Sequence, residues 1–177
     1  MNGDQPTFFN LTIKTIIVHT VSYFVMGILA FVLLDYTSLF SDPNFRNLMR
    51  ATNDPLVAAG PLFQPIRGFL FALVFYSLRG TFFGTKNGWL TMWLVLVVVG
   101  IFSAFGPTPG SIEGLIYTTI PLKLQLTGLP EVVLQALLLS FILCYWVKNP
   151  EKKWLSWTLG AIFLLVILFS ILGIMVG

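Results

Sequence analysis

Charged residues are scarce in this chain, and that scarcity argues against a soluble fold. Of the 177 residues, 10% are charged, whereas 56% are hydrophobic and 15% are aromatic. An ordinary soluble domain carries about 25% charged residues, so this chain has too little polar material to cover a surface that faces water. A lipid bilayer supplies the missing apolar solvent. We therefore predict a single integral membrane domain over residues 1–177.

Cysteine and histidine are each present once, as Cys144 and His19. One cysteine cannot form an internal disulfide, and one residue of each type is too few for a thiolate- or histidine-based metal site. The sequence also lacks the common phosphate-binding, hydrolase and metalloprotease motifs, and its basic residues form no patch typical of nucleic-acid binding. We expect no metal, no cofactor and no nucleic-acid partner.

Long apolar runs dominate what is present. Five of them approach the roughly 20 residues that a spanning helix needs. They cover residues 11–34, 61–83, 88–105, 130–147 and 154–176. The run Leu94–Phe102 is apolar at every position, which excludes the alternation of a barrel strand. The fold class predicted is all-α: a polytopic transmembrane helix bundle with about five spans. The first ten residues lack the basic start of a signal peptide, so we expect the first run to be retained as a span.

Basic residues in the connecting segments predict the orientation of this bundle. One side would carry Lys14, Arg79, Lys86, Lys148, Lys152 and Lys153, and the other side Arg46, Arg50 and Lys123. The richer side is expected to be cytoplasmic, which places the N-terminus inside and the C-terminus outside a plasma or inner membrane. The five tryptophans lie near predicted helix ends on the inner side, as an aromatic belt does.

Two outer loops are longer than a connection requires. In residues 35–60, Asp42 and Pro43 are typical of a helix start, and the apolar residues that follow predict a short interfacial helix. In residues 106–129, the segment Ile112–Thr119 has one apolar face between prolines and glycines. It predicts an interfacial or re-entrant helix that folds back on the bundle and closes an outer pocket.

Arg67 is the most informative polar residue, because a charge within a span either pairs inside the bundle or extends its side chain to the interface. Its expected partners are Glu113 and Glu131, although Glu131 also suits a helix N-terminus and Glu113 would be satisfied in water. We predict one ligand-binding or ion-pair pocket that opens outward and is lined by Gln64, Arg67, Glu113, Tyr117, Glu131 and Gln135.

The first span carries a second polar line. Thr12, Thr15, His19 and Ser22 recur at spacings of three and four and so share one helix face. Thr15, His19 and Ser22 are candidates for a proton relay, because the histidine pKa lies near neutrality. The alternative is a hydrogen bond from His19 to a neighbouring helix.

Three functions are compatible with these features. The first is binding or transport of a small solute or lipid-like ligand in the outer pocket. The second is an intramembrane enzyme that acts on a lipid through the carboxylates, Arg67 and Tyr117, although no diagnostic nucleophile is present. The third is an accessory or scaffold subunit of a larger membrane complex. In every case the lipid bilayer is a partner, and other membrane subunits are further candidates.

Overall fold

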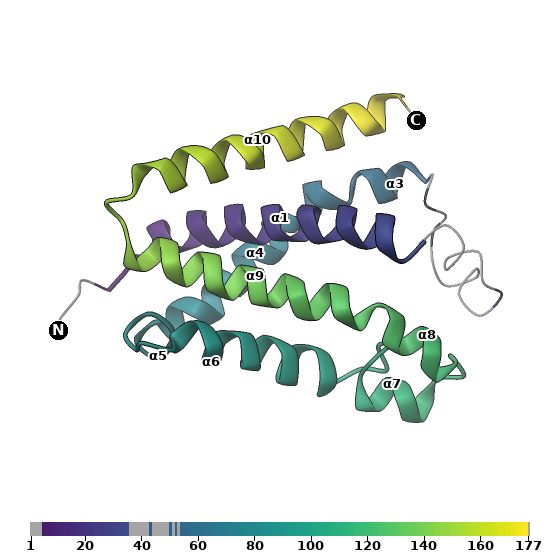
Figure 1. The fold of residues 1–177 in the computed structure, drawn as a ribbon. Helices are drawn as coiled ribbons and strands as arrows, with labels where there is room; N and C mark the ends of the chain where they lie inside the picture. The colour runs from purple at the N-terminus through teal and green to yellow at the C-terminus, as the bar shows by residue number, and fades with distance from the viewer. Residues whose placement is uncertain (1–4, 36–42, 44–49, 51, 53, 177) are drawn as a thin grey trace.

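The computed structural model describes residues 5–35, 43, 50, 52 and 54–176 (Figure 1). The described residues form helices and connections, without a strand, which confirms the all-α prediction. The elements are α1 (Phe8–Leu33), α3 (Pro55–Ala58), α4 (Gly60–Ser77), α5 (Arg79–Phe83), α6 (Gly88–Leu94), the π-helix η1 (Val95–Phe102), α7 (Ile112–Tyr117), α8 (Leu122–Thr127), α9 (Leu129–Lys148) and α10 (Lys153–Val176). The predicted interfacial helix that starts at Asp42 lies outside the described residues.

Three helical segments of the described chain are long and apolar enough to cross a membrane. They are Phe8–Leu33, Leu122–Lys148 and Lys153–Met175. The helix that begins at Gly60 contains Gln64 and Arg67 and ends after 18 residues, and the apolar helix Gly88–Phe102 is shorter still. Eighteen helical residues reach roughly 27 Å, slightly less than the hydrocarbon core. The expected count of about five spans is therefore not confirmed.

The long helices run back and forth, so that consecutive ones point in opposite directions (Figure 1). One end of the bundle holds the start of α1, the turn between α5 and α6, and the turn between α9 and α10; we call it the N-terminal end. The opposite end, the C-terminal end, holds α3, α7, α8 and the C-terminus. This alternation brings residues that are distant in the sequence to the same end of the bundle.

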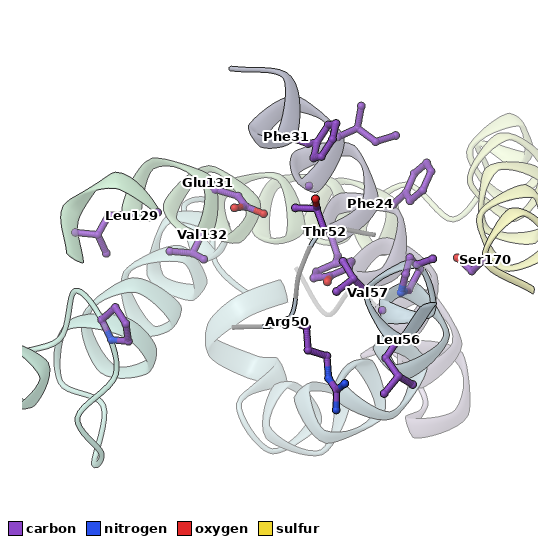
Figure 2. A pocket seen from close by; sticks show the side chains of 18 of the residues that line it. Phe24, Phe31, Arg50, Thr52, Leu56, Val57, Leu129, Glu131, Val132 and Ser170 are labelled. Carbon is purple, nitrogen blue, oxygen red and sulfur yellow. The ribbon is translucent and has the colours of Figure 1, made fainter. Parts of the chain in front are cut away.

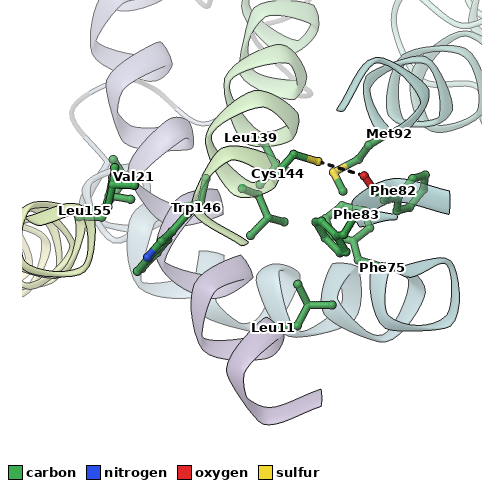
Figure 3. Close-up of a cluster of buried hydrophobic side chains, with 13 residues drawn as sticks. Leu11, Val21, Phe75, Phe82, Phe83, Met92, Leu139, Cys144, Trp146 and Leu155 are labelled. Carbon is green, nitrogen blue, oxygen red and sulfur yellow. Dashed lines mark hydrogen bonds between the residues drawn. The ribbon is translucent and has the colours of Figure 1, made fainter. Parts of the chain in front are cut away.

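The best-packed part of the molecule lies toward the N-terminal end. Figure 3 shows side chains from α1, α4, α5, α6, α9 and α10 converging there. Phe75 and Phe82 meet edge to face, with ring centroids 5.7 Å apart, and the Cys144 thiol donates to the Phe82 carbonyl at 3.7 Å. This core closes one half of the bundle and leaves the other half more open.

Helices α1 and α4 form the closest pair, and glycines make their approach possible. A Cβ atom added to Gly68 would lie 2.7 Å from the Cα atom of Ile16, and one added to Gly60 would lie 3.1 Å from the Tyr23 hydroxyl. Small residues allow helices to approach closely inside a membrane, where lipid provides no hydrophobic drive for association. The two contacts also show that α1 and α4 are antiparallel.

Candidate ligand-binding site

A cavity of about 900 Å³ opens in the C-terminal half of the bundle (Figure 2). Its walls come from the second half of α1, from α3 and the start of α4, from α8 and the start of α9, and from the second half of α10. Most of the lining is apolar, and the size lies in the range of drug-sized ligand pockets. The lining includes Tyr23, Phe24, Gly27, Ile28, Phe31, Leu56, Val57, Pro61, Leu124, Leu129, Val132 and Phe169.

Helix α1 supplies one continuous wall because its lining residues follow the helical repeat. Tyr23, Gly27 and Phe31 are spaced by four, and Phe24 and Ile28 repeat the same spacing beside them. A Cβ atom added to Gly27 would have no neighbour within 4 Å, so this glycine faces open space. Gly27 therefore widens the cavity in the middle of the wall.

Polar groups in the cavity are few. The Glu131 carboxylate enters from the first turn of α9, where the helix dipole favours a negative charge, and Tyr23 contributes to the lining from α1. Thr52, Gln125 and Ser170 also contribute to the lining. A mainly apolar chamber thus contains a small polar region.

A tight ion pair lies beside the cavity. Arg50, which contributes to the lining, donates to the Asp54 carboxylate at 3.0 Å. The same carboxylate caps α3 by accepting the Leu56 backbone N–H at 2.8 Å. The Leu56 hydrogen bond, followed by the Arg50 guanidinium, lowers the pKa of Asp54 from its usual value. Arg50 is thereby positioned by a partner that remains ionised at neutral pH.

The structure places the residues of the predicted pocket in different surroundings. Glu131 lines the described cavity, whereas the other five residues do not contribute to its lining. Gln64 is buried between α1 and α4. Arg67 is exposed on α4, donates to the Gln64 side chain at 3.4 Å and lies 6.0 Å from the Phe71 ring centroid. Among the described residues, no ion pair joins Arg67 to Glu113 or Glu131.

The remaining three predicted residues lie on α7 and α9. Glu113 is half-buried in the first turn of α7, and Tyr117 at the end of that helix is 72% exposed. Gln135 is half-buried on α9, one turn after Glu131. A role for these three side chains in ligand binding stays a prediction.

The polar side chains on one face of α1 form two kinds of hydrogen bond, one within the helix and one to α4. Thr15 and Ser22 donate to carbonyls of their own helix, those of Leu11 at 2.7 Å and His19 at 3.1 Å. His19 is 1% exposed, and its Nε2 lies 3.1 Å from the Gln64 side-chain oxygen on α4. These contacts match the alternative in which His19 bonds across to another helix, and the proton relay stays a prediction.

A buried glutamine organises the long loop between η1 and α9. Gln125 on α8 is 3% exposed, and its amide nitrogen donates to the Gly114 and Ile120 carbonyls and to the Thr118 hydroxyl. Its side-chain oxygen accepts the backbone N–H of Gly110, which has a φ of 86°. The loop is therefore a folded unit beside the cavity, consistent with the prediction that it is more than a tether.

Sequence reasoning missed the aromatic wall of α1, Gln125 and the residues from α10. The four-residue spacing of Tyr23, Gly27 and Phe31 was a usable signal, but it is equally typical of a lipid-facing helix. Comparison with protein families, with curated proteins and with solved structures found no match to this chain. The geometry of the site is therefore the basis for assigning a function.

Proposed function

We propose that this protein is an integral membrane protein that binds a lipid-like amphiphile in the cavity at the C-terminal end of its bundle. The single observation that carries the proposal is the cavity itself: about 900 Å³ and mainly apolar, with Glu131 and Arg50 as the charged groups among the described residues of its wall. A small polar solute would meet mostly hydrocarbon there. An amphiphile satisfies both parts of the lining, with its chain along α1 and its polar group near Glu131 and Tyr23.

We further propose that α4 and the segment Gly88–Phe102 complete five spans, with the N-terminus cytoplasmic and the cavity opening outward. The alternation of the long helices supports this arrangement, as does the gathering of basic residues at the N-terminal end. The short length of these two segments is compatible with spanning, because the bilayer thins around short helices at modest cost. A ligand could then enter the cavity from the outer leaflet without passing through the packed core near the N-terminal end.

The test is a comparison of ligand-induced stabilisation in wild type and in Gly27→Leu. The purified protein is placed in phosphatidylcholine nanodiscs, because detergent would compete for the cavity. Its thermal unfolding is recorded with single-chain amphiphiles that bear cationic, anionic, zwitterionic or alcohol headgroups, and with small polar solutes. A ligand at 100 times its dissociation constant stabilises the folded state by about 2.7 kcal/mol, which raises the melting temperature.

We expect at least one amphiphile to stabilise wild type in a saturable manner and Gly27→Leu to lose that response. The leucine side chain fills open space, so the variant should still fold. Gly160→Leu on α10 is the matched control, since a Cβ atom added at Gly160 also meets nothing within 4 Å and Gly160 does not line the cavity. Stabilisation that persists in Gly27→Leu would refute the cavity as the site, and a response to polar solutes alone would refute the amphiphile.

A further inference from the structure

Basic side chains gather at the N-terminal end of the bundle, away from the cavity. Arg79, Lys86, Lys148, Lys152 and Lys153 lie at the ends of α4, α5 and α9, at the start of α10 and in the turns between these helices. We call these five residues the basic surface. Among the described residues of these turns and helix ends, Glu151 is the one acid. The basic surface therefore has a strong excess of positive charge.

Three cations of the basic surface are held by neutral groups. Arg79 donates to the Tyr76 carbonyl at 2.8 Å, and its guanidinium lies 4.2 Å from the centroid of the Tyr76 ring. Lys148 donates to the Thr85 carbonyl, and Lys152 donates to the Tyr145 hydroxyl with its ammonium 4.5 Å from that ring centroid. Carbonyls and rings orient these cations but leave their net charge uncompensated.

Exposed tryptophans set the depth of this surface in the membrane. Trp154 and Trp157, in the first turns of α10, are 59% and 77% exposed. Tryptophan at a helix end favours the level of the lipid headgroups, where its ring is in apolar surroundings and its N–H can reach water. Lys152 and Lys153 directly precede this pair in the chain. In a bilayer, the tryptophans would hold Lys152 and Lys153 at the level of the lipid phosphates.

We propose that the basic surface is a docking site for anionic phospholipids of the leaflet that faces the N-terminal end. The lipid phosphate supplies negative charge opposite the five cations, against which the described residues there set one carboxylate, Glu151, and charge-assisted hydrogen bonds to lysine and arginine hold the phosphate. Lys14 is not part of this site. It is 8% exposed and directs its ammonium toward the Trp146 carbonyl and ring inside the bundle. The inference is independent of the ligand in the cavity.

Tryptophan fluorescence provides the test, because Trp154 and Trp157 are exposed beside the basic surface. The protein is reconstituted in phosphatidylcholine vesicles that contain increasing fractions of brominated phosphatidylglycerol, and in parallel of brominated phosphatidylcholine. Bromine quenches tryptophan on contact, so the two curves give the relative affinity for the anionic lipid. A single cation near the membrane surface changes that affinity on the order of fivefold.

For wild type we expect a severalfold preference for the anionic lipid that disappears in about 0.5 M salt, where screening is strong. The triple variant Lys148→Gln, Lys152→Gln, Lys153→Gln should lose most of the preference. Lys123→Gln, on α8 at the opposite end, should retain it. Equal quenching of wild type by both brominated lipids would overturn the proposal without reference to any variant, and a preference that survives in the triple variant would place the site elsewhere.

Discussion

At the scale of single residues, glycines with similar sequence surroundings have opposite roles. Gly27 and Gly160 face open space, whereas Gly68 meets the backbone of α1. All three lie inside helices, and the sequence alone does not show which of them meets a neighbouring helix. What separates them is the distance to a neighbouring helix, which only the packing determines.

The contact at Gly68 leads to a prediction about stability. In Gly68→Ala the new Cβ atom would lie 2.7 Å from the Ile16 Cα atom, so α1 and α4 must separate. Overpacking of this kind costs about 1–3 kcal/mol. Gly100→Ala has no neighbour within 4 Å and should be neutral or stabilising by about 0.5–1 kcal/mol, since alanine favours helices over glycine. Thermal unfolding in nanodiscs measures both variants; similar midpoints would contradict the tight α1–α4 contact.

Arg67 illustrates which contacts of a side chain can be predicted from the sequence and which cannot. Its neighbourhood with Gln64 was predictable, because residues three apart share a helix face, and the structure has the hydrogen bond between them. The expected ion pair with Glu113 or Glu131 is not formed among the described residues. Whether Arg67 forms an ion pair with a carboxylate on another helix depends on the rotation of each helix about its own axis. A one-dimensional pattern does not contain that rotation.

At the scale of elements, the loop Gly106–Leu129 acts as a unit because Gln125 connects its parts. One side chain bonds to Gly110, Gly114, Thr118 and Ile120, which cover the turn before α7, α7 itself and the segment that follows it. The length of this segment predicted a folded element. The residue that organises it was not predicted, because a glutamine side chain normally faces water.

Replacing Gln125 should loosen this loop. Gln125→Ala leaves several buried backbone groups without their partner, which costs about 1–3 kcal/mol for each unsatisfied group. We expect faster hydrogen exchange across residues 106–129, while exchange in the core of α1 and α9 stays unchanged. Glu113→Gln is the matched control on the surface of the same loop and should leave exchange as in wild type. Fast exchange of this loop already in wild type would contradict the folded unit.

At the scale of the whole molecule, the alternation of helices assigns each connection to one end of the bundle. The turn at Pro150–Lys152 lies at the N-terminal end, and α8 lies at the C-terminal end (Figure 1). If the helices cross a membrane, these two segments face opposite compartments. The excess of basic residues at the N-terminal end predicts that this end faces the cytoplasm.

Cysteine labelling in intact cells tests this orientation. A membrane-impermeant maleimide should label Lys123→Cys and should label Lys152→Cys only after the cells are opened. The wild-type chain is the control, because Cys144 is 2% exposed and should not react. Labelling at position 152 in intact cells would reverse the orientation, and labelling at both positions would contradict the alternation.

The sequence by itself determined the helical class of the molecule. Its long apolar runs with few charges favour helices that are compatible with lipid, because the peptide groups of a helix bond within their own segment, and the structure has three helical segments long and apolar enough to cross a membrane. It also determined most helix positions, because glycines, prolines and charged residues flank each apolar run and indicate where the helix begins and ends.

The position and shape of the candidate site were determined by the tertiary structure. The cavity combines α1, α3, α4, α8, α9 and α10, and its open space exists because small residues such as Gly27 lie opposite helices that do not close on them. Such a gap is a property of several helices together, so no single segment of the chain encodes it.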